Sequence, residues 1–179
     1  MATEVSICSN ALRRLGDDPI TSLTEDTERA RLCNAFYEDT RDYVLRSHSW
    51  NFATTRATLP QLSTTPIYEY SYQYALPTDP YCLRVLSMEY NDYIYKIEHV
   101  AGIGRVLLSN EDTAKILYVA RITDTTQFDS MFVDCLTAKL AAELAYPVTN
   151  STTLQTQMEK LYMAKISEAR AIDGQETFI

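Results

Sequence analysis

The sequence predicts an α+β fold: a four-helix bundle made by the N- and C-terminal segments, with an antiparallel β domain inserted between them. Apolar residues recur at helical spacing before about residue 47 and again after about residue 128. Between these limits the pattern follows the two-residue period of β-strands. The period changes just after Trp50, the only tryptophan. We therefore place the helical bundle at residues 1–52 and 123–173, the β insertion at 53–122 and a C-terminal tail at 174–179.

The N-terminal segment predicts two helices. The first covers residues 3–15, where apolar residues share one face, and Gly16 caps its C-terminus. The second runs from Ser22 to about residue 47. Ser22 and Glu25 have the spacing of a capping box, in which each side chain binds a free backbone N–H of the first turn.

The C-terminal segment predicts two further helices. The third begins at about Phe128 and ends at Pro147, because proline lacks the N–H that a helix needs. The fourth covers residues 151–172 and stops before Gly174. Each of the four helices has a single apolar stripe to bury, and a bundle buries all four stripes together.

Short apolar runs that are close in sequence predict an antiparallel meander between residues 53 and 122. Four tyrosines alternate with mostly polar residues and predict one strand with an aromatic face: Tyr68, Tyr70, Tyr72 and Tyr74. That face either packs inside the protein or forms a contact surface for a second subunit or a sugar. Ile103 lies at a predicted hairpin tip, where an apolar side chain favours a contact role.

The region where the period changes also contains a pair of large aromatic residues. Trp50 and Phe52 follow the second helix directly and precede the first β pattern. Buried aromatic rings contribute much of the energy that holds packed elements together. We therefore expect these two side chains to anchor the bundle to the base of the β domain.

Charge and cysteine content exclude several classes of protein. The formal net charge is −8 and the pI about 4.7, so a surface that grips duplex DNA is not expected. The four cysteines lie far apart without a C-x-x-C pair, which predicts reduced core residues in a chain that folds in the cytoplasm. No apolar run approaches the ~20 residues of a membrane span.

We find no constellation of residues that indicates catalysis, a metal or a cofactor. His48 and His99 lie in different parts of the chain, and neither has a cysteine or second histidine at metal-ligand spacing. The acidic pair at residues 17 and 18 offers too few ligands for calcium and fits a turn. The glycines around Ile103 lack the third glycine of a nucleotide loop. The sequence therefore predicts a protein that is not an enzyme.

The order of several short motifs resembles the tail tubular protein A family of tailed phages, the head-to-tail adaptors also called gatekeepers. The longest is the run Arg-x-x-x-x-Arg-Ser-x-x-Trp-x-Phe-Ala-x-x-Arg-x-x-Leu at residues 41–59. Shorter matches cover residues 7–16, 20–23, 72–77 and 82–86. The resemblance extends in outline over the helical C-terminal third and so spans most of the chain.

This resemblance implies a virion structural protein that is synthesised in the host cytoplasm and functions at the head–tail connector. Such adaptors form a ring, usually of twelve copies, that joins the portal to the tail and forms part of the conduit for DNA ejection. The bundles build the ring wall, and the β part contacts neighbouring copies and the downstream tail or nozzle protein. The C-terminal segment docks on the portal, which assigns that role to Arg170, Phe178 and Ile179. The last two have no obvious intrachain partner.

Two other functions remain open at this point. The tyrosine face is also compatible with a carbohydrate- or peptide-binding module, because aromatic rings stack on sugars and apolar side chains. An enzyme that uses His48 or His99 is the third interpretation. The acidic net charge favours the adaptor, since DNA passes an acidic bore without specific binding.

Overall fold

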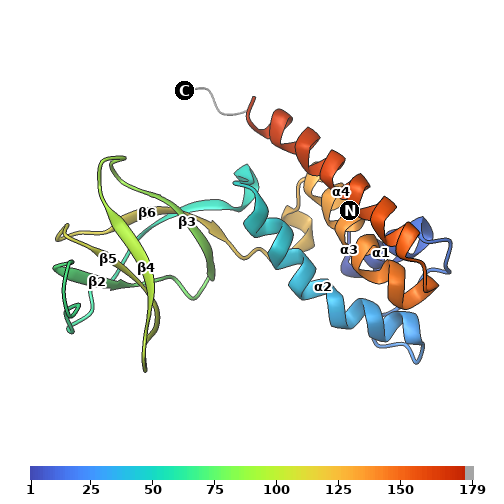
Figure 1. The fold of residues 1–179 in the computed structure, drawn as a ribbon, viewed down its shortest axis with the longest axis horizontal. Coiled ribbons are helices and arrows are strands. Elements are labelled where there is room, and N and C mark those ends of the chain that lie inside the picture. The colour runs from blue at the N-terminus through green and yellow to red at the C-terminus, as the bar shows by residue number, and fades with distance from the viewer. Residues whose placement is uncertain (176–179) are drawn as a thin grey trace. The chain divides into compact units, whose positions relative to one another are not determined.

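Two α-helices precede six β-strands and two more helices follow them in the computed structural model, which describes residues 1–175 (Figure 1). The chain divides into two compact units. The helical unit contains residues 1–52 together with the chain from residue 122 onward, and the β unit contains residues 53–121. Both strand sets are antiparallel. The α+β class that the sequence predicts is therefore confirmed.

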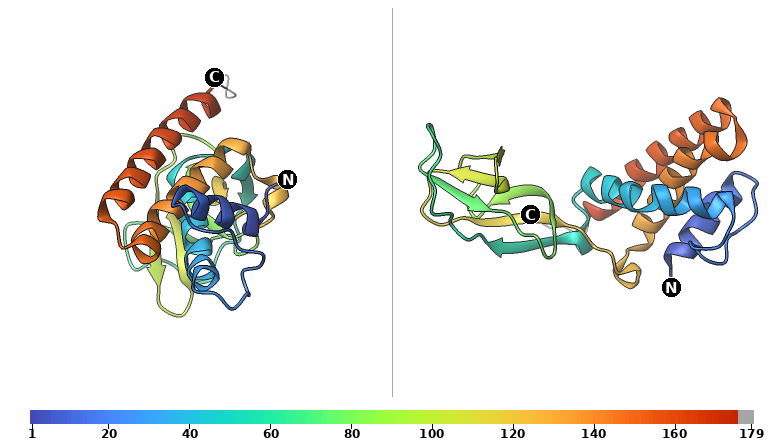
Figure 2. Two further views of the ribbon diagram at one scale, coloured as in Figure 1. Left: turned by 90° about the vertical axis from the view of Figure 1, so that its right-hand side faces the viewer. Right: turned by 90° about the horizontal axis from the view of Figure 1, so that it is seen from below.

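The central element of the helical unit is α3 (Ser130–Thr149), which contacts all three other helices. These are α1 (Glu4–Arg14), α2 (Glu28–Ser47) and α4 (Thr152–Asp173). The middle of α3 is buried nearly all round, which is typical of a helix enclosed by partners. Figure 2 shows α3 and α4 side by side, joined by a short connection. Because α1 and α2 contact each other little, the four-helix bundle stays a prediction.

The C-terminus of α1 is fixed by its own sequence, as expected. Gly16 has a φ of +78°, a conformation that suits a residue without Cβ. The Gly16 N–H donates to Arg13 O and the Asp17 N–H donates to Leu12 O, each at 3.1 Å. This pair of bonds is a Schellman motif. It satisfies two carbonyl groups that a helix end leaves free.

The start of α2 is later than the sequence predicted. The helix begins at Glu28, and the Thr27 side chain caps it. In the predicted capping box the Ser22 hydroxyl would accept from the backbone of Glu25, but it accepts from the Thr24 N–H at 3.1 Å. Residues before Thr27 therefore form turns. The predicted start was wrong because short polar side chains bind nearby backbone groups in turns as readily as at a helix end.

Pro147 does not end α3, which was also an error of prediction. The helix continues to Thr149 and ends at Asn150, whose φ of +53° is left-handed. The Asn150 N–H still donates to Tyr146 O at 2.8 Å. A proline in the last turn removes one N–H without removing the bonds that follow it. Asn150 then ends the helix, because asparagine tolerates this conformation better than most residues.

The β unit contains two three-stranded sheets. Sheet A has the order β1 (Thr54–Thr58), β6 (Lys115–Ala120), β3 (Cys82–Met88). Sheet B has the order β2 (Tyr72–Ala75), β5 (Gly104–Ser109), β4 (Tyr95–Val100). The largest buried side chains of this unit come from both sheets and include Tyr74, Leu107 and Tyr118.

The predicted meander is not observed. Among these strands only β4 and β5 are a hairpin of chain neighbours, whereas β6 pairs with both β1 and β3. Thr54 lies opposite Val119, so the first and last strands of the unit are partners. Sequence period identifies a strand but not its partner, which is why the strand order was missed. No helix in residues 1–175 has both the length and the hydropathy to cross a membrane.

Candidate functional site

The loop before β2 presents apolar side chains to solvent. Ile67 is 99% exposed and Tyr68 is 78% exposed. Glu69 has a φ of +74°, and the Tyr70 N–H donates to Tyr68 O at 2.9 Å. A positive φ at a residue with a side chain costs about 1–2 kcal/mol and is often found where function requires it. The turn at Glu69 interrupts the extended backbone before β2 begins at Tyr72. Its backbone conformation and its exposed apolar side chains indicate a contact role for this loop.

The same loop borders a groove of about 520 Å³ in the β unit. We call this the tyrosine groove. Two of the predicted tyrosines and the predicted hairpin-tip residue come together here: Tyr68, Tyr70 and Ile103. Ile103 is 45% exposed. The turn that carries it has left-handed glycines on both sides, at residues 102 and 104.

The polar residues of the tyrosine groove are mainly acidic or neutral. Glu69 and Glu98 both line it, and the Glu98 carboxylate pairs with Lys96 Nζ at 2.7 Å. The Gln73 side-chain amide donates to the Thr64 hydroxyl at the groove wall. An exposed ring at Tyr68 and a half-buried ring at Tyr70, beside carboxylates and amides, suit an apolar segment or a sugar. They do not suit a phosphate group.

The other two predicted tyrosines lie elsewhere. Tyr74 is 1% exposed, and its hydroxyl donates to Glu111 O at 2.5 Å. Burial raises the pKa of this phenol. Tyr72 is half-buried in β2 opposite Ser109. The chain turns at Glu69, so the four tyrosines do not share one face, and the predicted continuous aromatic strand was wrong.

Trp50 and Phe52 belong to an aromatic cluster of the helical unit. The Trp50 ring lies edge-on to the Phe132 ring, with 5.2 Å between their centroids. The Phe52 ring also lies against Phe132, with 5.1 Å between those two centroids. The Trp50 indole N–H donates to Val44 O at 2.9 Å. Phe128 completes the cluster through its contacts with Phe52 and Phe132. Their predicted role as an anchor between bundle and β domain stays a prediction.

The predicted portal-docking residues are only partly described. Arg170 lies on α4 and its guanidinium donates to Ser47 O, at the C-terminus of α2, at 2.9 Å. Gly174 caps α4. Phe178 and Ile179 lie outside the described residues. Arg170 therefore has a structural contact that the sequence did not indicate.

His48 forms a hydrogen bond with a carboxylate, and the acidic pair of the first loop forms ion pairs. His48 Nε2 lies 2.7 Å from Asp173 Oδ2, and its ring lies edge-on to Trp50. The neighbouring Ser47 hydroxyl donates to Val44 O at 2.8 Å. Asp17 and Asp18 both pair with Arg29. Residues 1–175 contain no group of three or more His, Cys, Asp or Glu side chains placed to hold a metal ion.

In the β unit, sequence reasoning missed three large exposed apolar residues: Ile67, Tyr90 and Ile94. Tyr90 is 55% and Ile94 72% exposed, in the loop between β3 and β4. The Tyr90 and Tyr93 rings form a T-shaped pair at 5.1 Å. An available signal was the position of these residues beside turn-forming residues, since apolar side chains in loops often serve contacts.

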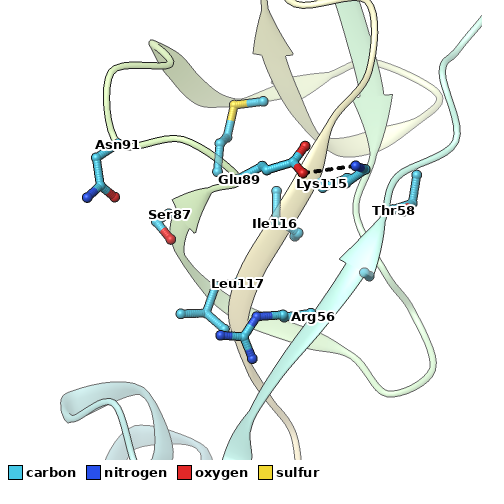
Figure 3. Close-up of a pocket in the computed structure, with 10 residues that line it drawn as sticks. Arg56, Thr58, Ser87, Glu89, Asn91, Lys115, Ile116 and Leu117 are labelled. Carbon is cyan, nitrogen blue, oxygen red and sulfur yellow. Dashed lines mark hydrogen bonds and ion pairs between the residues drawn. The ribbon is translucent and has the colours of Figure 1, made fainter. Parts of the chain in front are cut away.

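A second, polar groove of about 430 Å³ lies on sheet A. We call it the Arg56 groove. Figure 3 shows Arg56 of β1 beside Leu117 of β6, with Ser87 from β3 nearby. Lys115 Nζ pairs with Glu89 at 3.0 Å at the other end of the groove. Strand β1, which carries Arg56, was not singled out from the sequence.

The chain matches no protein-family model and no curated protein.

Proposed function

We propose that the protein is a structural head-to-tail adaptor of a tailed bacteriophage. It forms a ring, of twelve copies, that joins the portal to the tail and lines part of the DNA conduit. The observation that carries this proposal is the exposed apolar surface at the tyrosine groove. Ile67, Tyr68 and Ile103 are all large, apolar and exposed in the single chain. A protein–protein contact would remove this surface from water, at about 25 cal/mol for each Å² buried.

The tyrosine groove is the contact surface for a neighbouring copy or for the downstream tail protein. Two different surfaces of one chain that fit each other produce a closed ring when the rotation between copies closes. Tyr74 takes no part in this contact, because its ring is buried in the β unit. Tyr68, Tyr70 and Ile103 remain as the contact residues, and Ile67 is added to them.

The helical unit forms the wall of the ring, with its helices packed as a bundle. The C-terminal tail docks on the portal through Phe178 and Ile179, and Arg170 holds the base of the tail against α2. The net charge of −8 on every copy favours an acidic bore, along which DNA slides without specific binding. The adaptor resides in the virion at the head–tail connector.

The first test measures particle mass by light scattering, for the chain alone and mixed with portal protein. We expect a ring in at least one of the two conditions. Tyr68→Ala is expected to weaken assembly at least about tenfold, since an aromatic anchor often contributes 2 kcal/mol or more. Tyr146→Ala is a matched control, because Tyr146 is also exposed but lies on α3. A wild-type chain that stays monomeric in both conditions would rule out the adaptor.

A second test concerns the tail. Removal of residues 174–179 is expected to abolish portal attachment and to leave the circular dichroism spectrum unchanged. Attachment at wild-type strength by the shortened chain would show that the tail is not the docking element.

The second candidate function is a carbohydrate- or peptide-binding module. The tyrosine groove favours it, because its tyrosine rings line the same groove as the hydrogen-bonding side chains of Glu98 and Gln73. Glycan- and peptide-array binding that is lost in Tyr70→Ala, by a chain that never assembles, would support this function over the adaptor. No binding to either array would exclude it.

A further inference from the structure

Arg56 differs from every other arginine of the chain. In residues 1–175 each of the others has a hydrogen bond, an ion pair, a ring contact or another electrostatic interaction. Arg56 has none of these, and its side chain is exposed. Within residues 1–175 no group occupies its five N–H donors, which are therefore offered to a ligand from outside the chain.

The surroundings of Arg56 favour an anionic ligand. The register places Arg56 and Ser87 each opposite Leu117, so both lie on the same face of sheet A. The hydroxyl groups of Thr58 and Ser87 line the groove as further donors. Lys115 adds a positive charge, although Glu89 already balances it. A guanidinium binds a carboxylate through two parallel hydrogen bonds, and adjacent hydroxyls complete such a site.

The chain itself offers carboxylates that have no partner. It contains 24 acidic against 16 basic residues, so acids outnumber the basic side chains that could pair with them. Glu38 and Asp39 are adjacent and exposed on α2, and within the described residues neither forms a hydrogen bond or an ion pair. An acidic helix face and a groove with a free arginine are complementary in charge.

We propose that the Arg56 groove binds the Glu38–Asp39 face of α2 from a neighbouring copy of the chain. This inference rests on the proposed ring, and it names one of the contacts between copies. The two surfaces are different parts of one chain, so the contact is heterologous, as a ring requires. A single exposed ion pair is weak, but the contact is repeated between every pair of neighbours.

A charge-exchange experiment tests the contact. Arg56→Glu places like charges together and is expected to raise the protein concentration at half assembly about tenfold or more, as measured by light scattering. The chain that combines Arg56→Glu with Glu38→Lys and Asp39→Lys restores opposite charges at the contact. We expect its assembly to return to within about threefold of wild type. Salt should weaken wild-type assembly, because exposed charges are screened.

Controls separate this contact from general effects of charge. Lys160→Glu makes the same charge change on α4, where Lys160 is exposed and has no ion pair in the described residues, and should assemble normally. A thermal melt of each variant shows whether the charge reversal impairs folding. If it does, Arg56→Gln tests the same contact, because it removes the positive charge without adding a negative one.

The outcomes also separate this inference from the adaptor itself. A wild-type chain that never assembles, alone or on the portal, refutes both. Normal assembly of both Arg56 variants refutes only the contact proposed here. Assembly that is unchanged in Arg56→Glu, together with weaker retention of duplex DNA, would show that the groove binds phosphate instead. Failure of the charge-exchanged chain to recover would show that Glu38 and Asp39 are not its partner.

Discussion

Trp50 connects the C-terminus of α2 to the aromatic cluster of the helical unit. It is 1% exposed and contacts the rings of His48, Phe52 and Phe132. Its indole N–H also donates to Val44 O, which accepts from the Ser47 hydroxyl as well, in the last turn of α2, where carbonyl groups lack helical partners. The sequence pointed to Trp50 because it follows a helix and precedes a change of period. The hydrogen bond to Val44 was not predictable, because it depends on how the chain folds back after the helix.

The first prediction concerns this hydrogen bond. Trp50→Phe keeps an aromatic ring but removes the donor and leaves a small cavity. We expect the free energy of unfolding to fall by about 2 kcal/mol, because the buried indole loses its hydrogen bond and part of its packing, while Val44 O keeps only the Ser47 hydroxyl as a donor. Urea unfolding followed by circular dichroism at 222 nm measures the change, since the variant has no tryptophan. Tyr68→Phe, on an exposed side chain, should stay within about 0.5 kcal/mol of wild type. An unchanged midpoint for Trp50→Phe would mean that neither bond nor packing contributes.

At the scale of elements, three helices meet at one carboxylate. Asp134 of α3 pairs with Arg14 of α1 at 2.5 Å and with Lys165 of α4 at 2.9 Å. Partial burial favours the neutral acid, but the hydrogen bonds from Lys165 and Arg14 outweigh burial and hold the pKa of Asp134 below its usual value. Lys165 and Arg14 stabilise only the charged form of the acid.

The second prediction follows from the direction of this shift. A pKa that is lower in the folded state stabilises the fold above the unfolded value of 3.8. This stabilisation is lost as the pH falls through the folded pKa. We expect Asp134→Asn to lower the free energy of unfolding by about 1 kcal/mol at pH 7, a value reduced for the 35% exposure of the side chain. The difference from wild type should shrink below pH 4.

Thermal unfolding across pH 2.5–7, with the chain kept dilute enough to be monomeric, measures the effect. Asp39→Asn is the matched control, since Asp39 is an exposed helical acid without an ion pair in the described residues. Its difference from wild type should be small at every pH. A constant difference for Asp134→Asn down to pH 2.5 would mean that the carboxylate charge is not what stabilises the three helices.

Local signals located some elements well and failed for others. The C-terminus of α1 followed from Gly16, because a cap depends on residues within one turn. The start of α2 did not, because the residues around Ser22 formed turns instead. Strand β1 has no apolar alternation, and it exists because β6 pairs with it. The Arg56 groove depends on three strands from distant parts of the sequence, so the motif at residues 41–59, which includes Arg56, did not predict a groove.

At the scale of the whole molecule, an insertion interrupts a helical chain. The β unit is one continuous segment, and its two end strands are partners: Thr54 lies opposite Val119. The helical unit is discontinuous, and α3 contacts helices from both sides of the insertion. The prediction of one strand with four tyrosines on a single face failed because it ignored how the chain folds over the whole β unit. The turn at Glu69 moves Tyr68 to the groove, whereas Tyr74 packs in the core of the β unit.

The last prediction is that the β unit folds without the helices. A segment of residues 53–121 starts and ends on paired strands, so its excision breaks no strand pairing within the two sheets. It has about 70 residues, a size at which single domains fold but are marginally stable. We expect dispersed amide resonances and a cooperative thermal transition followed by tyrosine absorbance. Protection from hydrogen exchange should be strongest in β6 and β5, which are central in their sheets.

The matched control is the same segment without residues 53–58, which lacks β1 and leaves an edge of β6 unpaired. Its thermal transition should have a lower midpoint temperature or be absent. Poorly dispersed amide resonances in the segment of residues 53–121 would show that the sheets need the helical unit to fold.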